Sequence, residues 1–299
     1  MLSFLPPVVK GSLFFLLCAL TTTLSFFLLA PGILLKRFLK EPHSAARVTA
    51  AMMTVGTFWA EANTFFFTLT QDTKWDMDIA GDLQKDKWYL VICNHQSWTD
   101  VMVLNKLLSR KVSFPKFFMK EELKWLPFFG WAATALDFPS MKRHSRGYLK
   151  KHPEAKGADL ETTRKFCERF KYVPTTVFNF LEGTRYTPEK AKRQNTPYRH
   201  LLLPKAGGAA LVFYSMGEYL TAIINVTIVY SQPNLTFWEF ICGKSERIVA
   251  RAELLPVPEE FLNKDYQHDV EFQQQFQNWI NQQWQEKDDL IEKIYTHLN

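Results

Sequence analysis

A histidine and an aspartate stand five residues apart in the stretch VICNHQSWTD, residues 91–100. His95 follows a run of aliphatic residues typical of a strand, and Asp100 lies near the start of the next predicted helix. A turn from strand to helix lets the carboxylate fold back onto one imidazole nitrogen, leaving the other free to accept a proton. The pair therefore predicts a general base that acts on a substrate hydroxyl. The alternative is a turn histidine beside an acid at a helix N-terminus.

A second candidate site follows another apolar run, in the stretch FNFLEGTRY at residues 178–186. Gly183 permits a close backbone approach, while Thr184 and Arg185 offer a hydroxyl and a planar set of donors that suit a phosphate. We expect Glu182 to hold the Arg185 guanidinium in place. A turn with a surface ion pair is the alternative, and it would contribute little stability. Together the two stretches indicate a proton acceptor and an anion-binding group.

The elements that must position these residues are short apolar runs that alternate with amphipathic stretches. Strands are predicted at residues 88–93, 117–120, 132–138, 173–181, 221–230, 237–242 and 247–254. Helices are predicted at residues 98–108, 121–130, 158–172 and 206–217, and an amphipathic helix at 269–298 is expected to cover the sheet. This alternation predicts an α/β domain with a mixed, largely parallel sheet flanked by helices. Chemistry in such sheets gathers where strands end, which is where both candidate sites fall.

The pairing of N-H-x4-D, from Asn94 to Asp100, with E-G-T-R at residues 182–185 resembles the glycerolipid acyltransferase family, which includes the lysophosphatidic acid acyltransferases. The similarity extends over most of residues 85–255, including LKWLPFFGWAA at residues 123–133. With its N-terminal apolar segment and the tail WQEKDDLIEKIY, the whole chain resembles bacterial inner-membrane members of that family.

The resemblance implies acyl transfer from a thioester, either acyl-CoA or acyl carrier protein, to the free hydroxyl of a lysophospholipid. The acceptor it indicates is 1-acyl-sn-glycerol 3-phosphate, with phosphatidic acid as product, and a lysophospholipid with another headgroup is the alternative. It places the base and its orienting acid at His95 and Asp100. The acceptor-phosphate site falls on Glu182, Gly183, Thr184 and Arg185. No metal or cofactor is expected, and the expected partners are the lysophospholipid, the acyl thioester, the membrane and, where it is the donor, acyl carrier protein, without nucleic acid.

Two departures from the family pattern affect the remaining assignments. The family supplies a second phosphate anchor from a block that reads G-x-x-F-[IVL]-x-R. Here Phe138 and Arg143 are separated by PSMK, two residues more than that pattern allows. Arg143 is the assigned anchor, with Arg146 and Lys142 as alternatives. The family's last block is an apolar strand that contains proline, whereas residues 220–230 contain none, so the acyl-donor contacts stay unassigned.

The N-terminus predicts a membrane helix. Residues 11–30 carry no charge, and as a helix they would span about 30 Å, the thickness of the hydrocarbon core of a bilayer. A cleaved signal peptide is the alternative, but no A-x-A site precedes Pro31 and the apolar run is long for one. More basic residues follow this segment than precede it, which predicts a cytoplasmic catalytic domain. The residues that follow are Lys36, Arg37, Lys40 and Arg47. The bacterial inner membrane is the location that the resemblance implies.

A second helix is predicted from residue 44 to about residue 69, with Glu61 at its middle. An acid at mid-bilayer is costly and needs a partner, so this helix is expected to be interfacial or re-entrant and to pack beside the first. Residues 1–70 would then form the anchor, and residues 71–299 the α/β acyltransferase domain.

Composition leaves two further hypotheses. The net charge of +6 and the 15% aromatic content also suit a non-catalytic membrane-associated binder of lipid or nucleic acid. The stretch FYSMG comes near the nucleophile elbow of serine hydrolases, but it lacks the first glycine and lies in a predicted helix, so Ser215 is interpreted as structural.

The four cysteines lie far apart, without a C-x-x-C pair, and are expected to be reduced thiols.

Overall fold

The computed structural model describes residues 2, 4–126, 129–141, 167–232, 235–262, 264, 266 and 268–298. Within them the strands are β1 (Lys74–Ala80), β2 (Trp88–Cys93), β3 (Pro115–Phe117), β4 (Met119–Lys120), β5 (Ser140–Met141), β6 (Thr176–Phe180), β7 (Leu220–Tyr230) and β8 (Arg247–Leu255). The α-helices are α1 (Pro7–Lys36), α2 (Pro42–Thr70), α3 (Asp100–Leu108), α4 (Phe129–Ala135), α7 (Pro188–Gln194), α8 (Gly207–Met216), α9 (Phe237–Ile241) and α10 (Val270–Leu298). Short 3₁₀ helices cover Glu121–Trp125, Glu168–Tyr172 and Glu259–Phe261.

Six strands form one sheet in the order β1-β8-β7-β2-β6-β3. β2 runs parallel to β6 and β7, and β3 runs parallel to β6, whereas β8 is antiparallel to β7. The predicted mixed, largely parallel sheet is therefore confirmed. In the register of β2 with β6, Cys93 lies opposite Phe180, and each is the last residue of its strand. The loops that follow these two strands consequently leave the sheet side by side.

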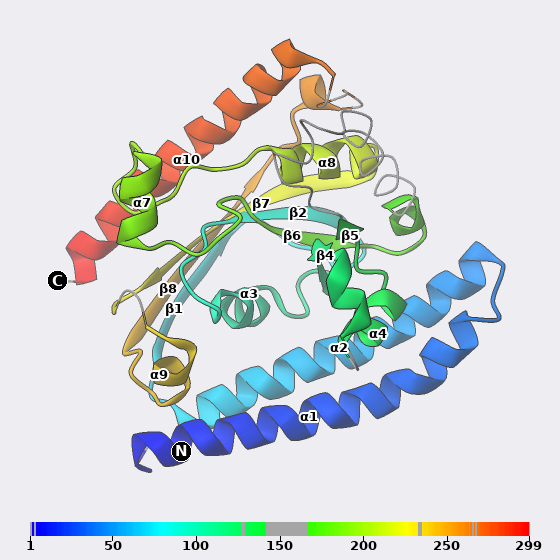
Figure 1. The fold of residues 1–299 in the computed structure, drawn as a ribbon, viewed down its shortest axis with the longest axis horizontal. Coiled ribbons are helices and arrows are strands. Elements are labelled where there is room, and N and C mark those ends of the chain that lie inside the picture. The colour runs from blue at the N-terminus through cyan, green and yellow to red at the C-terminus, as the bar shows by residue number, and fades with distance from the viewer. Residues whose placement is uncertain are drawn as a thin grey trace.

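Two hydrophobic layers cover the sheet, because alternate residues of each strand point to opposite faces. Along β2, Leu90 and Ile92 pack with α8 and α10, while Tyr89, Val91 and Cys93 pack with α3, α9 and the inner sides of α1 and α2. Figure 1 shows α8 and α10 on one side of the sheet and α3 and the long α1–α2 hairpin on the other. The prediction that the C-terminal helix packs over the sheet is confirmed.

The α1–α2 hairpin contacts the α/β domain at both ends of α1. Near the start of α1, Gly11 lies so close to Trp238 and Cys242, at α9, that a side chain there would collide with the cysteine sulfur. At the end of α1, Lys36 Nζ lies 2.8 Å from Asp137 Oδ2, beyond α4. In α2, Glu61 binds the Arg110 guanidinium through both carboxylate oxygens, at 2.6 and 2.7 Å.

By length and composition alone, α1 is the one helix in the described part of the chain that could cross a membrane. Most of its large apolar side chains are exposed, since the helix buries only one narrow side against the rest of the protein. The exposed ones include Val8, Phe15, Leu16, Leu20, Leu24, Phe27, Leu28, Leu34 and Leu35.

Two predicted strands are helices, and four elements within the described residues were not predicted. Residues 132–138 fall largely in α4, and residues 237–242 form α9, because short apolar runs do not distinguish a buried strand from a buried helix. Thr236 and Glu239 form a capping box at the start of α9, a start signal that T-x-x-E carries in the sequence. The missed elements are the edge strand β1, the short strand β5, the short helix α7 and the 3₁₀ helix Glu259–Phe261. Most of the predicted helix at residues 158–172 lies outside the described residues.

Asp288 links α10 to the segment between α7 and α8, since its buried carboxylate accepts the backbone N–H groups of Arg199 and His200 at 2.9 and 2.8 Å. We expect Asp288→Ala to lower the free energy of unfolding by about 1–3 kcal/mol, because two amide donors lose their acceptor. Chemical denaturation followed by circular dichroism measures this change. Asp289→Ala, at the exposed neighbouring position, is the matched control, and an equal loss in both variants would contradict the assignment.

Candidate active site

The loop after β2 carries the first candidate motif. Asn94, the first residue of this loop, is hydrogen-bonded to the sheet. Asn94 is fully buried, its side-chain Nδ2 donates to the Ile228 carbonyl at 2.8 Å, and its Oδ1 accepts the Ile228 N–H at 2.9 Å. The amide thus pairs with the backbone of β7 as a further strand residue would. This fixes the point at which the chain leaves the sheet toward His95.

His95 and Asp100 are in direct contact, as predicted from their spacing. The distance from His95 Nδ1 to Asp100 Oδ2 is 2.8 Å. Asp100 is the first residue of α3 and is fully buried, whereas the His95 side chain is 18% exposed. Because the same carboxylate oxygen also accepts the backbone N–H groups of Gln96 and Ser97, it acts as an acceptor toward Nδ1. Nδ1 therefore carries the proton in the neutral ring, and Nε2 has the free lone pair.

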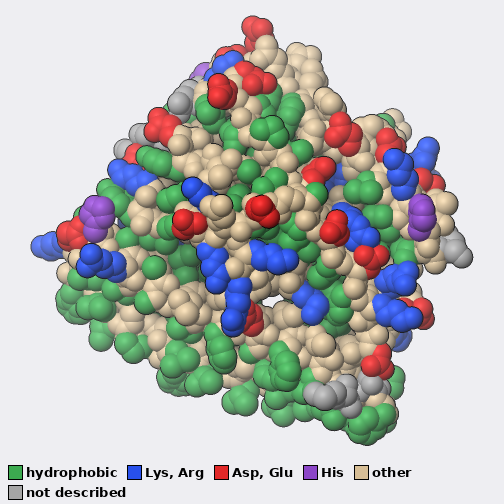
Figure 2. All heavy atoms as spheres, turned by 180° about the vertical axis from the view of Figure 1, so that it is seen from behind, with side chains coloured by type: hydrophobic (Ala, Val, Ile, Leu, Met, Phe, Trp, Pro, Cys, Tyr) green, Lys and Arg blue, Asp and Glu red, His purple; other side chains and the backbone are tan. Residues whose placement is uncertain are grey.

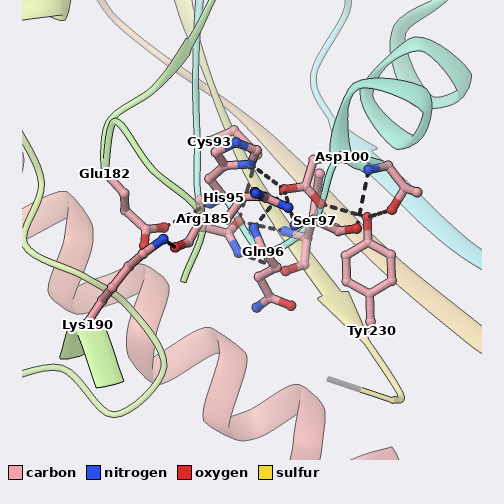
Figure 3. Close-up of polar contacts among 12 residues, drawn as sticks. Cys93, His95, Gln96, Ser97, Asp100, Glu182, Arg185, Lys190 and Tyr230 are labelled. Carbon is pink, nitrogen blue, oxygen red and sulfur yellow. Dashed lines mark hydrogen bonds and ion pairs between the residues drawn. The ribbon is translucent and has the colours of Figure 1, made fainter. Parts of the chain in front are cut away.

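The remaining partners of the dyad are Tyr230 and Phe180. The Tyr230 hydroxyl donates to Asp100 Oδ1 at 2.6 Å and lies 2.9 Å from the Thr99 hydroxyl (Figure 3). Burial, and then the neighbouring Asp100 carboxylate, raise the pKa of Tyr230 well above its usual value, so the phenol stays protonated as a donor. Phe180 stacks on the imidazole with ring centroids 4.2 Å apart. Stacking on Phe180 fixes the plane of the imidazole ring, and the contact with Asp100 fixes the direction in which Nδ1 points.

Glu182 has a different partner from the one predicted. Its buried carboxylate accepts the His95 N–H at 2.8 Å through one oxygen and the Leu202 N–H at 3.0 Å through the other. Burial raises the pKa of this carboxyl to about 8, while the two amide hydrogen bonds favour its charged form. The expected ion pair with Arg185 is not formed among the described residues. Glu182 therefore connects the two candidate loops and does not reach outward to a ligand.

The rest of the second motif forms a cationic rim beside the histidine. Gly183 has a φ of +65°, a conformation that glycine adopts without strain, and it turns the chain away from β6. The Tyr186 N–H then donates to the His95 carbonyl at 2.7 Å. The Arg185 guanidinium lies over the ring of Trp98, 4.6 Å from its centroid, and is half-buried. Because Trp98 belongs to the loop between His95 and Asp100, Arg185 sits above the same loop as the dyad.

Lys190 adds a second cation to this rim. Its Nζ donates to the Thr184 hydroxyl at 2.9 Å and to the Arg185 carbonyl at 2.8 Å. Helix α7 presents this lysine, and the Thr187 side chain caps the first turn of that helix by accepting the Lys190 N–H. Thr184, which was predicted to bind the phosphate, is therefore hydrogen-bonded to Lys190, a residue outside the E-G-T-R motif. Figure 3 shows Lys190 beside the loop that carries Arg185.

The remaining predicted residues fall outside this arrangement. Arg143 and its alternatives Lys142 and Arg146 lie outside the described residues, so the second phosphate anchor stays a prediction. Ser215 lies inside α8 and not on a turn between strand and helix, which agrees with its interpretation as structural. In the described part of the chain, no group of three or more His, Cys, Asp and Glu side chains is arranged to hold a metal ion.

Tyr230, Phe180, Trp98 and Lys190 belong to the site, although they were not predicted from the sequence. Tyr230 ends β7 and Phe180 ends β6, so both fall at strand ends where functional residues gather. Their position at strand ends could have identified Tyr230 and Phe180 from the sequence. For Trp98 and Lys190 the sequence carried no such signal, because their contacts depend on how the two loops fold over each other.

Comparison with known proteins identifies the family. The profile of the family described as "Acyltransferase" matches residues 76–230, more than half of the chain, and this range contains both loops and Tyr230. The chain therefore belongs to the acyltransferase family.

Two curated relatives illustrate the similarity. The 1-acyl-sn-glycerol-3-phosphate acyltransferase epsilon of Mus musculus is 27% identical over 244 residues, which cover 72% of this chain and 60% of that protein. The lysocardiolipin acyltransferase 1 of Gallus gallus is 25% identical over 221 residues, which cover 69% and 53%. The chain thus spans only part of the length of these relatives.

Among solved structures, the 1-acyl-sn-glycerophosphate acyltransferase PlsC of Thermotoga maritima aligns with a TM-score of 0.45 at 16% identity. The alignment covers 88% of this chain and 95% of that one.

The contact of Glu182 with two amides predicts a structural effect of its removal. We expect Glu182→Gln to lower the free energy of unfolding by about 1–3 kcal/mol, because the glutamine NH₂ group faces one of the two backbone donors and leaves it unpaired. Denaturant titration of the purified protein measures this loss. Glu189→Gln, at an exposed position in the first turn of α7, is the control, and the assignment fails if both variants are as stable as the wild type.

Proposed function

We propose that this protein is a membrane-bound acyltransferase. It moves a fatty acyl group from a thioester to the free hydroxyl of a lysophospholipid, with 1-acyl-sn-glycerol 3-phosphate as acceptor and phosphatidic acid as product. The observation that carries the proposal is the 2.8 Å contact between His95 and buried Asp100, placed beside the Arg185 loop. Membership in the acyltransferase family and the similarity to relatives named 1-acyl-sn-glycerol-3-phosphate acyltransferases support it.

In the proposed reaction His95 is the general base. Nε2 takes the proton of the acceptor hydroxyl as its oxygen attacks the thioester carbonyl, and Asp100 stabilises the imidazolium that forms. Collapse of the tetrahedral intermediate breaks the C–S bond, and the imidazolium returns its proton to the departing thiolate. The products are the ester and the free thiol, from acyl-CoA or acyl carrier protein. The proposed scheme needs neither a metal nor a cofactor.

Binding of the acceptor phosphate is assigned to the cationic rim. Arg185 offers a planar set of donors and Lys190 a second positive charge, while the connection of the two loops through Glu182 and Tyr186 keeps this rim beside His95. A phosphate held there places the acceptor hydroxyl near the base, and such positioning supplies much of the rate.

The exposed side of α1 is the proposed membrane contact. Figure 2 shows hydrophobic side chains along the lower margin of the molecule, where α1 runs, and Lys and Arg side chains on the face above them. Apolar groups that insert at the headgroup boundary, together with nearby cations, are typical of attachment to an anionic membrane. We place the protein at the inner membrane with its α/β domain in the cytoplasm, where acyl thioesters are made.

The headgroup has a second candidate, because one relative is named a lysocardiolipin acyltransferase. A panel of lysophospholipids, offered with acyl-CoA and with acyl carrier protein thioesters, distinguishes the candidates when the lipid products are read by mass spectrometry. Incorporation of acyl groups only into an acceptor other than 1-acyl-sn-glycerol 3-phosphate would replace the proposed substrate.

We expect His95→Ala to lower kcat by at least about 10²-fold, because general-base catalysis is lost while the fold is kept. Release of free thiol in the presence of acceptor measures the rate, and circular dichroism checks the fold. His297→Ala, at an exposed position near the end of α10, is the control. Near-normal turnover by a folded His95→Ala variant would show that the base is another group.

We expect Arg185→Ala to raise the KM for the acceptor by about 10- to 100-fold and to leave the KM for the acyl thioester nearly unchanged. The reason is the loss of charge-assisted hydrogen bonds to the acceptor phosphate. Initial rates measured as each substrate is varied separate the two constants, with Arg193→Ala on the exposed side of α7 as the control. A change confined to the thioester KM would contradict the phosphate role.

A further inference from the structure

A pocket of about 480 Å³ lies at the end of the α1–α2 hairpin, between the first turn of α2 and the segment around Tyr172. This volume falls in the range of pockets that hold small molecules. None of His95, Asp100, Arg185 and Lys190 lines it. Figure 1 shows the turn between α1 and α2 at one end of the molecule and α7, which follows the Arg185 loop, at the other. The pocket is therefore separate from the candidate active site.

Lys116 lines this pocket from strand β3 and is only 1% exposed. Among the described residues, its Nζ makes no hydrogen bond and no ion pair, and it lies over the ring of Phe170, 4.4 Å from the centroid. Burial lowers the pKa of Lys116 to about 8, partly offset by the carboxylate of Asp137. A buried ammonium that makes no direct hydrogen bond or ion pair is costly, and an anion in the pocket would supply both.

Two carboxylates, those of Asp137 and Glu168, also line the pocket, and its cations outnumber them. These cations are Lys36, Lys40, Lys116, Arg169 and Lys171. Asp137 is already bound by Lys36 at 2.8 Å, by the Thr49 hydroxyl at 2.9 Å and by Arg169 at 3.4 Å. Lys40 and Lys171 also line the pocket, are exposed, and form no ion pair with a carboxylate in the described part of the chain. The pocket thus presents a buried cation at its wall and two more exposed ones.

We propose that this pocket binds the phosphate groups of an anionic ligand, with Lys116 as the buried contact and Lys40 and Lys171 as exposed contacts. Phosphate fits this set because lysine serves as a point-charge partner for it and several cations share its charge. Three sources carry this chemistry: free phosphates, the phosphates of coenzyme A, and the headgroup of an anionic lipid beside α1. The proposal requires no turnover and stands apart from the role of His95.

The test measures equilibrium binding by titration calorimetry, with the full-length protein in neutral detergent. Three probes are used, namely inorganic pyrophosphate, free coenzyme A and a soluble short-chain phosphatidylglycerol. We expect at least one probe to bind the wild type, and Lys116→Met to weaken that binding at least tenfold. Lys293→Met, at an exposed position of α10, should bind as the wild type does. The probe that loses affinity in Lys116→Met identifies the source of the phosphate.

A second variant guards against a folding defect in Lys116→Met. Lys40→Gln with Lys171→Gln changes only exposed side chains, and we expect it to weaken the same probe about threefold or more. The proposal is overturned if no probe binds the wild type. It is equally overturned if both the Lys116→Met protein and the double variant bind every probe as tightly as the wild type. A His95→Ala protein should keep this binding, which separates the pocket from the proposed reaction.

Discussion

The hydrogen bond from the His95 amide to the Glu182 carboxylate is the interaction on which the site depends. It joins the loop that carries the imidazole to the loop that carries Arg185, at the ends of two adjacent parallel strands. The second oxygen of the same carboxylate holds Leu202, so one buried side chain fixes three segments that are distant in sequence. The proposed reaction requires a constant separation between the base and the phosphate-binding group, and this carboxylate joins the two loops that carry them.

Helix α10 stabilises this arrangement from the face of the sheet opposite α3. The Trp284 indole donates to the Leu202 carbonyl at 3.1 Å, next to the amide that Glu182 holds. Lys287, fully enclosed, donates to the Thr227 hydroxyl at 3.1 Å and to the Val226 carbonyl of β7, and burial lowers its pKa to about 8. The C-terminal helix therefore does more than cover apolar surface, because it braces the strand that ends in Tyr230.

The sequence predicted contacts between residues that are close along the chain, and it did not predict contacts that depend on strand pairing. The pairing of His95 with Asp100 was predictable, since a turn of five residues after a strand brings the two together. The partner of Glu182 was not, because adjacency favoured Arg185 while the actual partners are amides brought close by strand pairing. Tyr230 reaches Asp100 only through the register of β7 with β2. The helix α9 was misassigned because a short apolar run suits either kind of element.

The attachment of α1 at both of its ends has a consequence for diffusion and access. Gly11 packs against α9 and Lys36 is bound to Asp137, so the helix is held against the α/β domain at both ends, unlike an anchor attached at one end only. If the protein binds the membrane through this helix, the α/β domain would keep a fixed distance from the membrane surface and a fixed orientation relative to it. Under the proposed function, acceptor molecules would then diffuse laterally within the leaflet to a cationic rim that stays at a fixed distance from the membrane surface.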